Sequence, residues 1–243
     1  MRRFTDLHLR FPRGNLGELE EMLKLSSDLG YSTIAISFNQ NMRDEIKQAR
    51  AICSDLGIDL ATRVDLEPNT AGELLRALKE LRYKSEIIAV KCLTKPVARQ
   101  AAKDRRVDLL NFPTEATQRE RIHFDHQEAV LASGSLSALE INASTILGGE
   151  PSRRARLLAT MRKEIAEARR MGVPFILSSG AEDLYGLRSP RDLASLLALM
   201  DLDWELALDA VSEEPLKIVE RNRQKLKAGY ISPGVRVVEE GTK

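Results

Sequence analysis

Residues 58–90 read IDLATRVDLEPNTAGELLRALKELRYKSEIIAV, and they contain a complete strand–helix–strand unit. The stretch 58–66 is rich in apolar and β-branched residues and predicts a strand. Thr70 and Glu73 form a capping box, which is typical of a helix start. Residues 87–90 are a continuous apolar run of the kind found in parallel strands buried on both faces. Short connections of this type predict parallel neighbours joined by right-handed crossovers.

The same alternation extends over most of the chain on both sides of this unit. Gly30 and Gly57 end successive predicted helices and lie 27 residues apart, a spacing that suits a regular barrel. After the last predicted strand only helices are expected. We predict seven strands, at residues 4–9, 33–38, 58–66, 87–90, 107–112, 136–141 and 173–178.

Two architectures fit this order, a doubly wound sheet and a closed barrel. No G-x-G-x-x-G motif follows the first strand, which removes the usual dinucleotide-binding fingerprint. We therefore favour an α/β fold in the form of a distorted, seven-stranded TIM-like (β/α) barrel. No Gly/Ser-rich linker divides the chain, so we expect one domain over residues 1–243, with C-terminal helices over 190–229 and a short tail at 230–243. In such a barrel the C-terminal ends of the strands form the functional face.

Composition excludes several classes of protein. The chain has 243 residues, with 37 basic and 36 acidic side chains and a net charge of +1. This net charge gives no indication of nucleic-acid binding. No apolar run reaches the about 18 residues that a membrane span needs. Residues 1–13 are charged and lack the apolar segment of a secretory signal. Cys53 and Cys92 suit a reducing environment as small core residues, so we expect a cytoplasmic protein.

Charge distribution is more informative than net charge. Residues 91–106 and 151–170 are two basic zones, and residues 201–214 are an acidic zone. Each zone could be an ordinary solvated helix face. Together they suggest a surface for nucleic-acid phosphates and another for a protein partner. With few aromatic residues, contact with the shape and phosphates of folded RNA fits better than base stacking on single strands.

Two enzymatic readings remain as alternatives. A stand-alone metal-dependent phosphoesterase would draw on Asp6, His8, Asp65 and Glu140. However, too few further ligands are available, and a hydrogen-bonded structural pair is the simpler account of Asp6 and His8. In a metal-free barrel enzyme, Lys91 would act as a Schiff-base or general-base lysine at a strand end.

Several segments resemble those of one family and follow the same order along the chain, namely VDLLNFP (107–113), LEIN (139–142), ILSSGA (176–181), LRSPRDL (187–193), PLKIVERN (215–222) and YISPGV (230–235). The chain resembles the protein component 3 family of archaeal ribonuclease P, whose eukaryotic homologue is shared by RNase P and RNase MRP. The resemblance covers nearly the whole chain. It implies a distorted barrel similar to the polymerase-and-histidinol-phosphatase fold, in agreement with the strand count.

The resemblance also implies a function. The chain would be a subunit of the ribonucleoprotein that removes the 5′ leader from precursor tRNA by endonucleolytic cleavage. Catalysis would belong to the RNA and its magnesium ions, and this chain would hold no catalytic residue, metal or cofactor. Its partners would be the RNase P RNA, precursor tRNA through the holoenzyme, protein component 2, typically in a heterotetramer with two copies of each, and the other protein components.

The predicted RNA-binding residues lie in or near the net-positive segments and strand ends. Their role would be charge-assisted contact with phosphates. For residues 179–181, an ordinary turn after a strand and a backbone cradle for a phosphate are both open. The predicted residues are Arg63, Lys91, Lys95, Arg105, Arg106, Ser179, Gly180 and Arg188.

Overall fold

The computed structural model describes residues 2–12, 15–38, 42–148, 151–227, 230–232 and 235–236. Its strands are β1 (Phe4–Arg10), β2 (Tyr31–Ser37), β3 (Asp59–Leu66), β4 (Ile87–Lys91), β5 (Leu109–Asn111), β6 (Ala138–Asn142), β7 (Phe175–Ser178), β8 (Tyr230–Ser232) and β9 (Val235–Arg236). Its helices are α1 (Leu16–Asp28), α2 (Arg43–Asp55), α3 (Ala71–Leu81), α4 (Lys95–Lys103), α5 (Ala116–Arg121), α6 (His126–Ser135), α7 (Ala143–Leu147), α8 (Pro151–Arg170), the 3-10 helix η1 (Leu184–Gly186), α9 (Pro190–Ala198), α10 (Trp204–Asp209) and α11 (Glu213–Leu226).

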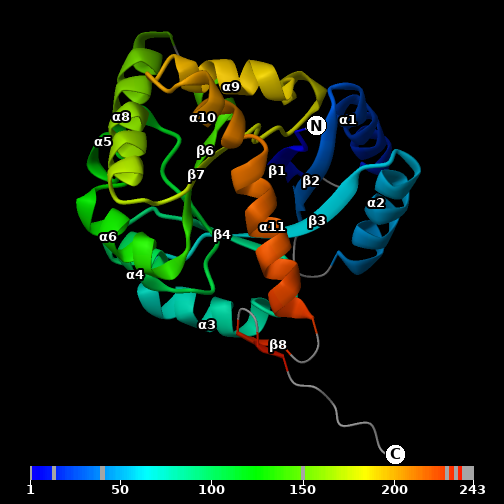
Figure 1. The fold of residues 1–243 in the computed structure, drawn as a ribbon, viewed down its shortest axis with the longest axis horizontal. Helices are drawn as coiled ribbons and strands as arrows, with labels where there is room; N and C mark the ends of the chain where they lie inside the picture. Colours follow the sequence, from blue (N-terminus) through cyan, green and yellow to red (C-terminus); the bar gives the residue numbers. More distant parts are fainter. Residues whose placement is uncertain are drawn as a thin grey trace, which may run out of the picture.

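Strands β1 to β7 form one parallel sheet in the order of the sequence. The sheet curls until β7 meets β1, where Leu9 pairs with Ala181. The seven-stranded barrel is thus confirmed, and the doubly wound sheet is wrong, because a doubly wound sheet reverses its strand order. Figure 1 shows the strands at the centre and the helices around them.

The β1–β7 junction is completed by a turn in place of an eighth strand. The backbone amide of Thr5 in β1 donates to the carbonyl of Val211 at 2.9 Å. On the other side, the amide of Leu177 in β7 donates to the carbonyl of Ala210 at 3.1 Å. Residues 210 and 211 lie between α10 and α11, so this turn satisfies backbone groups on both strands that a missing strand would otherwise leave unpaired.

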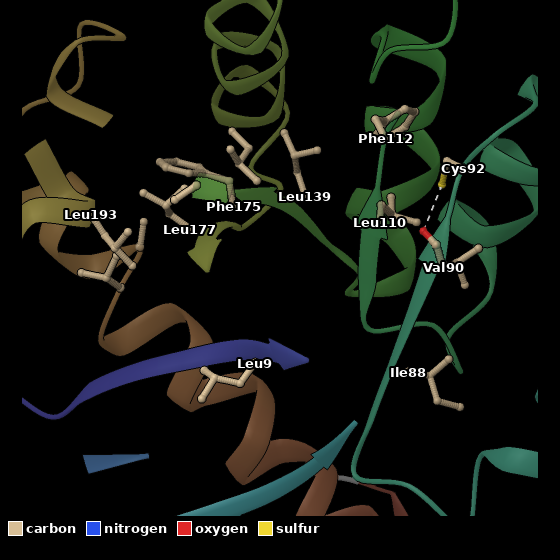
Figure 2. Close-up of a cluster of buried hydrophobic side chains, with 14 of the residues drawn as sticks. Leu9, Ile88, Val90, Cys92, Leu110, Phe112, Leu139, Phe175, Leu177 and Leu193 are labelled. Atoms are coloured by element: carbon tan, nitrogen blue, oxygen red, sulfur yellow. Dashed lines mark hydrogen bonds between the residues drawn. The ribbon is translucent and has the colours of Figure 1, made fainter. Parts of the chain in front are cut away.

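Alternation along each strand divides the apolar residues into two cores. In β4, Ile87 and Ala89 belong to the core inside the barrel, whereas Ile88 and Val90 belong to the larger core under the helices. Figure 2 shows part of this outer core, with Leu110 and other strand residues directed toward the helices. The continuous apolar run at 87–90 is therefore buried on both faces, as predicted.

Helix α11 closes the N-terminal end of the barrel. Its Ile218 and Val219 join the inner core with Leu7 and Leu109. Figure 1 shows α11 crossing the strands and running toward the short antiparallel hairpin of β8 and β9. The C-terminal end of the barrel, by contrast, is lined by polar side chains from several strands.

The structure corrects several boundaries and one omission. The strands predicted at 107–112, 136–141 and 173–178 are shorter or shifted, as β5, β6 and β7. The hairpin of β8 and β9 follows α11, where only helices and a tail were expected. Gly229, expected to end the last helix, lies outside the described residues, as do 228, 233–234 and 237–243. Within the described ranges, no helix is long and apolar enough to cross a membrane.

Candidate functional site

The Arg63 guanidinium lies inside the barrel and is fully buried. Its Nη1 and Nη2 donate to the two carboxylate oxygens of Glu140, both at 2.7 Å, and Nη1 also donates to the carbonyl of Leu7 at 2.7 Å. Its Nε and Nη2 donate to Oδ1 of Asp65 at 3.0 and 2.7 Å. One cation from β3 therefore neutralises carboxylates from β3 and β6.

Further polar side chains complete a connected network around Glu140. Ser178 Oγ donates to Glu140 Oε1 at 2.7 Å, and Asn111 Nδ2 donates to Glu140 Oε2 at 2.6 Å. Asn142 Nδ2 donates to Asn111 Oδ1 at 2.8 Å, and His8 Nδ1 donates to Asn142 Oδ1 at 2.7 Å. Residues from β1, β5, β6 and β7 are thus joined in one hydrogen-bonded network. We use the term mouth network for these residues and the two from β3, namely His8, Arg63, Asp65, Asn111, Glu140, Asn142 and Ser178.

The mouth network keeps its two carboxylates ionised. Burial by itself would raise the pKa of Asp65, but Arg63 and His8, whose Nε2 lies 3.5 Å from Asp65 Oδ2, hold that pKa well below its ordinary value. Burial opposes the ionised form of Glu140 too, yet Arg63 lowers the pKa of this group as well. Both negative charges are therefore neutralised inside the protein by Arg63 of the same chain.

An irregularity in β1 directs His8 into the mouth network. Pairing between β1 and β2 shifts by one residue between Asp6 and Leu9. Leu7 therefore joins the inner core while its neighbour His8 also reaches the mouth network. The expected hydrogen bond between Asp6 and His8 is present, but it runs from the His8 backbone amide to Asp6 Oδ1 at 3.0 Å. Sequence alternation alone could not reveal this shift.

The geometry does not suit the two enzymatic alternatives. The carboxylates of Asp65 and Glu140 are occupied by Arg63, so they are not free to bind a cation. Among the described residues, no group of three or more His, Cys, Asp or Glu side chains could hold a metal ion. Lys91 forms an ion pair with Glu67 at the partly exposed rim, unlike the buried apolar setting that activates a lysine nucleophile.

Three predicted RNA-binding residues are buried, and the predictions for them are corrected. Arg63 is fully buried in the mouth network and cannot reach a phosphate in this structure. Ser179 is also fully buried, and its Oγ donates to the carbonyl of His8 at 3.3 Å and accepts from the amide of Ala181 at 3.1 Å. With Gly180 beside it, Ser179 forms a tight structural turn, so the phosphate cradle is not formed.

Gly180 is required by this turn. Its φ is +64°, and a Cβ there would lie 2.5 Å from Ser144 Oγ and 3.0 Å from Asn142 Cβ. We expect Gly180→Ala to lower the free energy of unfolding by about 1–3 kcal/mol, as measured by urea unfolding. Gly134→Ala is the matched control, because Gly134 lies in α6 with open space at its Cβ position, and it should stabilise by about 0.5–1 kcal/mol. Equal effects of the two substitutions would contradict this account.

The remaining predicted residues do not meet at one place. Lys95 is held by internal acceptors, since its Nζ donates to Asp125 at 2.8 Å and to Glu128 at 2.9 Å. Arg188 is partly exposed between η1 and α9 and donates to the carbonyls of Tyr185 and Leu187, while its own carbonyl accepts from the Tyr31 hydroxyl at 2.9 Å. The structure therefore gives no common phosphate site from Lys91, Lys95 and Arg188.

Arg105 and Arg106 lie at the opposite end of the barrel, because they follow α4 and precede β5. Residues distant in sequence surround them there. Arg82 Nη1 donates to the carbonyl of Arg106 at 3.1 Å and to Asp108 at 2.6 Å, and Arg221 Nη2 donates to Asp108 at 3.0 Å. The basal surface, as we call this region, consists of Arg82, Tyr83, Arg105, Arg106, Arg221 and Lys225.

Lys225 shows that the basal surface is electropositive. Burial lowers the pKa of Lys225, and nearby Arg221, Arg82 and Arg105 lower it further against the pull of Asp108, to about 8. Sequence analysis did not select Lys225 or Tyr83, because both lie outside the basic zones at 91–106 and 151–170. The packing of α11 against the barrel brings Lys225 to Arg105, and Tyr83 approaches Arg106 from the end of α3.

The other charged zones are largely neutralised by ion pairs. In the basic zone 151–170, Arg162 pairs with Asp201 of the acidic zone, and Arg170 pairs with Glu167. Arg2 pairs with Glu205 and Asp209 in the acidic zone. The basic zone 151–170 and the acidic zone 201–214, which suggested two separate binding surfaces, are therefore joined to each other by an ion pair.

Comparisons with known proteins agree over nearly the whole chain. A family model described as RNase P subunit p30 matches residues 3–227. A protein of Methanococcoides burtonii named ribonuclease P protein component 3 is 27% identical over 238 residues, which cover 98% of this chain and 95% of that relative.

Solved structures show the same fold. A chain in a structure described as the cryo-EM structure of archaeal ribonuclease P with mature tRNA matches with a TM-score of 0.85 at 24% identity, covering 98% of this chain and 100% of that one. Histidinol phosphate phosphatase from Lactococcus lactis, solved with zinc, L-histidinol and phosphate, matches with a TM-score of 0.51 at 11% identity, covering 90% and 94% of the two chains. The fold therefore resembles the polymerase-and-histidinol-phosphatase barrel, although the mouth of this chain does not fit a zinc site, since Arg63 pairs with both Asp65 and Glu140.

Proposed function

Because this chain belongs to the RNase P subunit p30 family, it is a protein subunit of ribonuclease P, and we propose that it supports the catalytic RNA without performing chemistry itself. In this role it contributes to removal of the 5′ leader from precursor tRNA. One observation carries the proposal for a noncatalytic chain. In the mouth network, the carboxylates of Glu140 and Asp65 both accept hydrogen bonds from Arg63. These two carboxylates are therefore not available to bind a metal ion for hydrolysis.

The proposal extends to the assembly in which the chain works. Magnesium would be bound by the partner RNA. The chain would bind RNase P RNA and protein component 2, as a heterotetramer with two copies of each, and would act with the other protein components in the cytoplasm. The name of the archaeal relative, ribonuclease P protein component 3, supports an enzyme with several protein components. Native mass spectrometry of the mixed chains would test the stoichiometry, and a complex without two copies of each chain would contradict it.

Reconstitution tests the proposed function. We expect the purified chain, freed of nucleic acid, to leave both precursor tRNA and bis(p-nitrophenyl) phosphate uncleaved with Mg²⁺, Mn²⁺ or Zn²⁺. Added to RNase P RNA and the other protein components, the same chain should increase the rate of 5′-leader removal. The matched control is the mixture without this chain. Cleavage by the chain alone that a chelator abolishes would favour the phosphoesterase alternative, and an unchanged rate in the mixture would contradict the proposed role.

A further inference from the structure

We propose that the basal surface is an RNA-binding site, where Arg105 and Lys225 contact backbone phosphates and the ring of Tyr83 stacks on an unpaired base. This inference rests on the proposed function, since it names the surface by which the subunit meets RNA. It places that surface at the N-terminal end of the barrel, around the end of α11, and not at the strand ends that form the functional face of related barrels.

The first step is the excess of positive charge. Five basic side chains of the basal surface share two nearby carboxylates. Asp108 pairs with both Arg82 and Arg221, and Asp104 pairs with Arg106. Within the part of the chain that the structure describes, Arg105 and Lys225 have no hydrogen bond or carboxylate partner from their side chains. These two cations are therefore free to contact an external anion.

The second step is the position of Lys225. It lies one helical turn beyond Arg221 in α11 and is only partly exposed, between cations on several elements. Holding five ammonium and guanidinium groups beside only two carboxylates is unfavourable, and the pKa of Lys225 is lowered by burial and then by this repulsion. A phosphate bound here would relieve the repulsion. A neutral or cationic ligand would not.

The third step is the exposed aromatic ring. Tyr83 is 83% exposed, although it follows the buried Arg82 and precedes the exposed Lys84. The hydrogen bond with Asp104 is the main cause of the raised pKa of Arg106, and Tyr83 lies close enough to contribute. A largely exposed ring near Arg106 suits stacking on a nucleobase, because every base offers a π face and cations beside the ring can hold the phosphate backbone. An acidic protein segment would use the cations but would leave the ring without a specific role.

The phosphate contacts are tested with Arg105→Ala/Lys225→Ala. The affinity of the full chain for RNase P RNA is measured as a function of salt, together with the other protein components. For two lost phosphate contacts, the slope of log affinity against log salt should become shallower by about 1.5. The matched control is Lys24→Ala/Lys47→Ala, which removes two exposed lysines of α1 and α2 that have no ion pair in the described residues, and it should leave the slope unchanged.

The stacking contact is tested with Tyr83→Ala and Tyr83→Phe. Alanine should weaken RNA binding by about 5-fold or more, whereas phenylalanine keeps the ring and should bind as the parent does. Because Tyr83 is exposed, neither change should alter the unfolding transition. Equal loss in both variants would point to the phenolic hydroxyl and would overturn the stacking contact.

The outcomes separate this inference from the proposed function. If the parent chain stimulates reconstituted RNase P but Arg105→Ala/Lys225→Ala keeps its RNA affinity and salt slope, the basal surface is not the RNA site and the proposed function stands. If the parent chain itself neither binds the RNA nor stimulates cleavage, the proposed function is contradicted, and the inference about the basal surface falls with it. Loss of binding to a protein component, with RNA affinity intact, would show that the basal surface meets protein and would overturn the inference.

Discussion

Replacing Arg63 with methionine is expected to lower the free energy of unfolding by about 3–5 kcal/mol, because it leaves the buried Glu140 and the largely buried Asp65 without their cation. Glu140 is fully buried, and two of the hydrogen bonds that its carboxylate accepts come from the Arg63 guanidinium. Methionine fills part of the same space but can donate no hydrogen bond. Urea unfolding at neutral pH, followed by circular dichroism, measures the change.

Companion variants identify the cause of the loss. Arg63→Lys keeps the charge but not the planar fork that meets two carboxylates, so its loss should be smaller than that of Arg63→Met and still measurable. Arg63→Met/Glu140→Gln removes one of the unpaired charges and should recover part of the loss. Arg43→Met, at an exposed position of α2, is the matched control and should change stability by less than about 0.5 kcal/mol. A loss at Arg63 no larger than at Arg43 would contradict the role of the mouth network.

The pH dependence of stability is expected to change sign between the parent chain and Arg63→Met. In the parent, the folded-state pKa values of Asp65 and Glu140 lie below their ordinary values. Their stabilisation is therefore complete above about pH 4.5 and is lost as the pH falls through the folded-state pKa values. Without Arg63, burial raises both pKa values, so the variant should gain stability as the pH is lowered from 7 toward about 5.

The measurement is the free energy of unfolding from pH 7 to 3 for both proteins. Asp6 contributes with the opposite sign, because burial raises the pKa of its carboxyl group, but it does so in both proteins and cancels in the difference. The difference between the two curves should shrink on acidification. Parallel curves would show that Arg63 does not control the ionisation of Asp65 and Glu140.

Much of the barrel was predictable because its signals are local. The apolar run at 87–90 predicted a strand with two buried faces, and the helix start predicted from Thr70 and Glu73 is formed, with the Thr70 side chain accepting from the Glu73 amide. The short helices α5 and α6, which connect β5 to β6, and α7, which directly follows β6, were not predicted, because these segments show no clear apolar period. The hairpin of β8 and β9 was missed because the final segment gave no alternating pattern.

The candidate site was much less predictable. Arg63 was selected because it is a basic residue at a strand end, but its charge serves Glu140, which lies 77 residues further along the chain. Lys95 was selected for its place in a basic zone and is held by Asp125 and Glu128. A cation that contacts RNA and a cation that neutralises a buried acid look alike in sequence, because their difference lies in partners that the fold supplies.

The sequence by itself determined the parallel strands, their number in the barrel, and a family resemblance that the comparisons confirm. These depend on apolar periodicity, caps and motifs, all of which act over a few neighbouring residues. Only the tertiary structure decided which charges are satisfied internally and which remain for a partner. Ring closure brings Arg63 to Glu140, and the packing of α11 brings Lys225 to Arg105. The reason is physical: electrostatic and hydrogen-bond energies depend on distance in space and on burial, and neither is encoded by position along the chain.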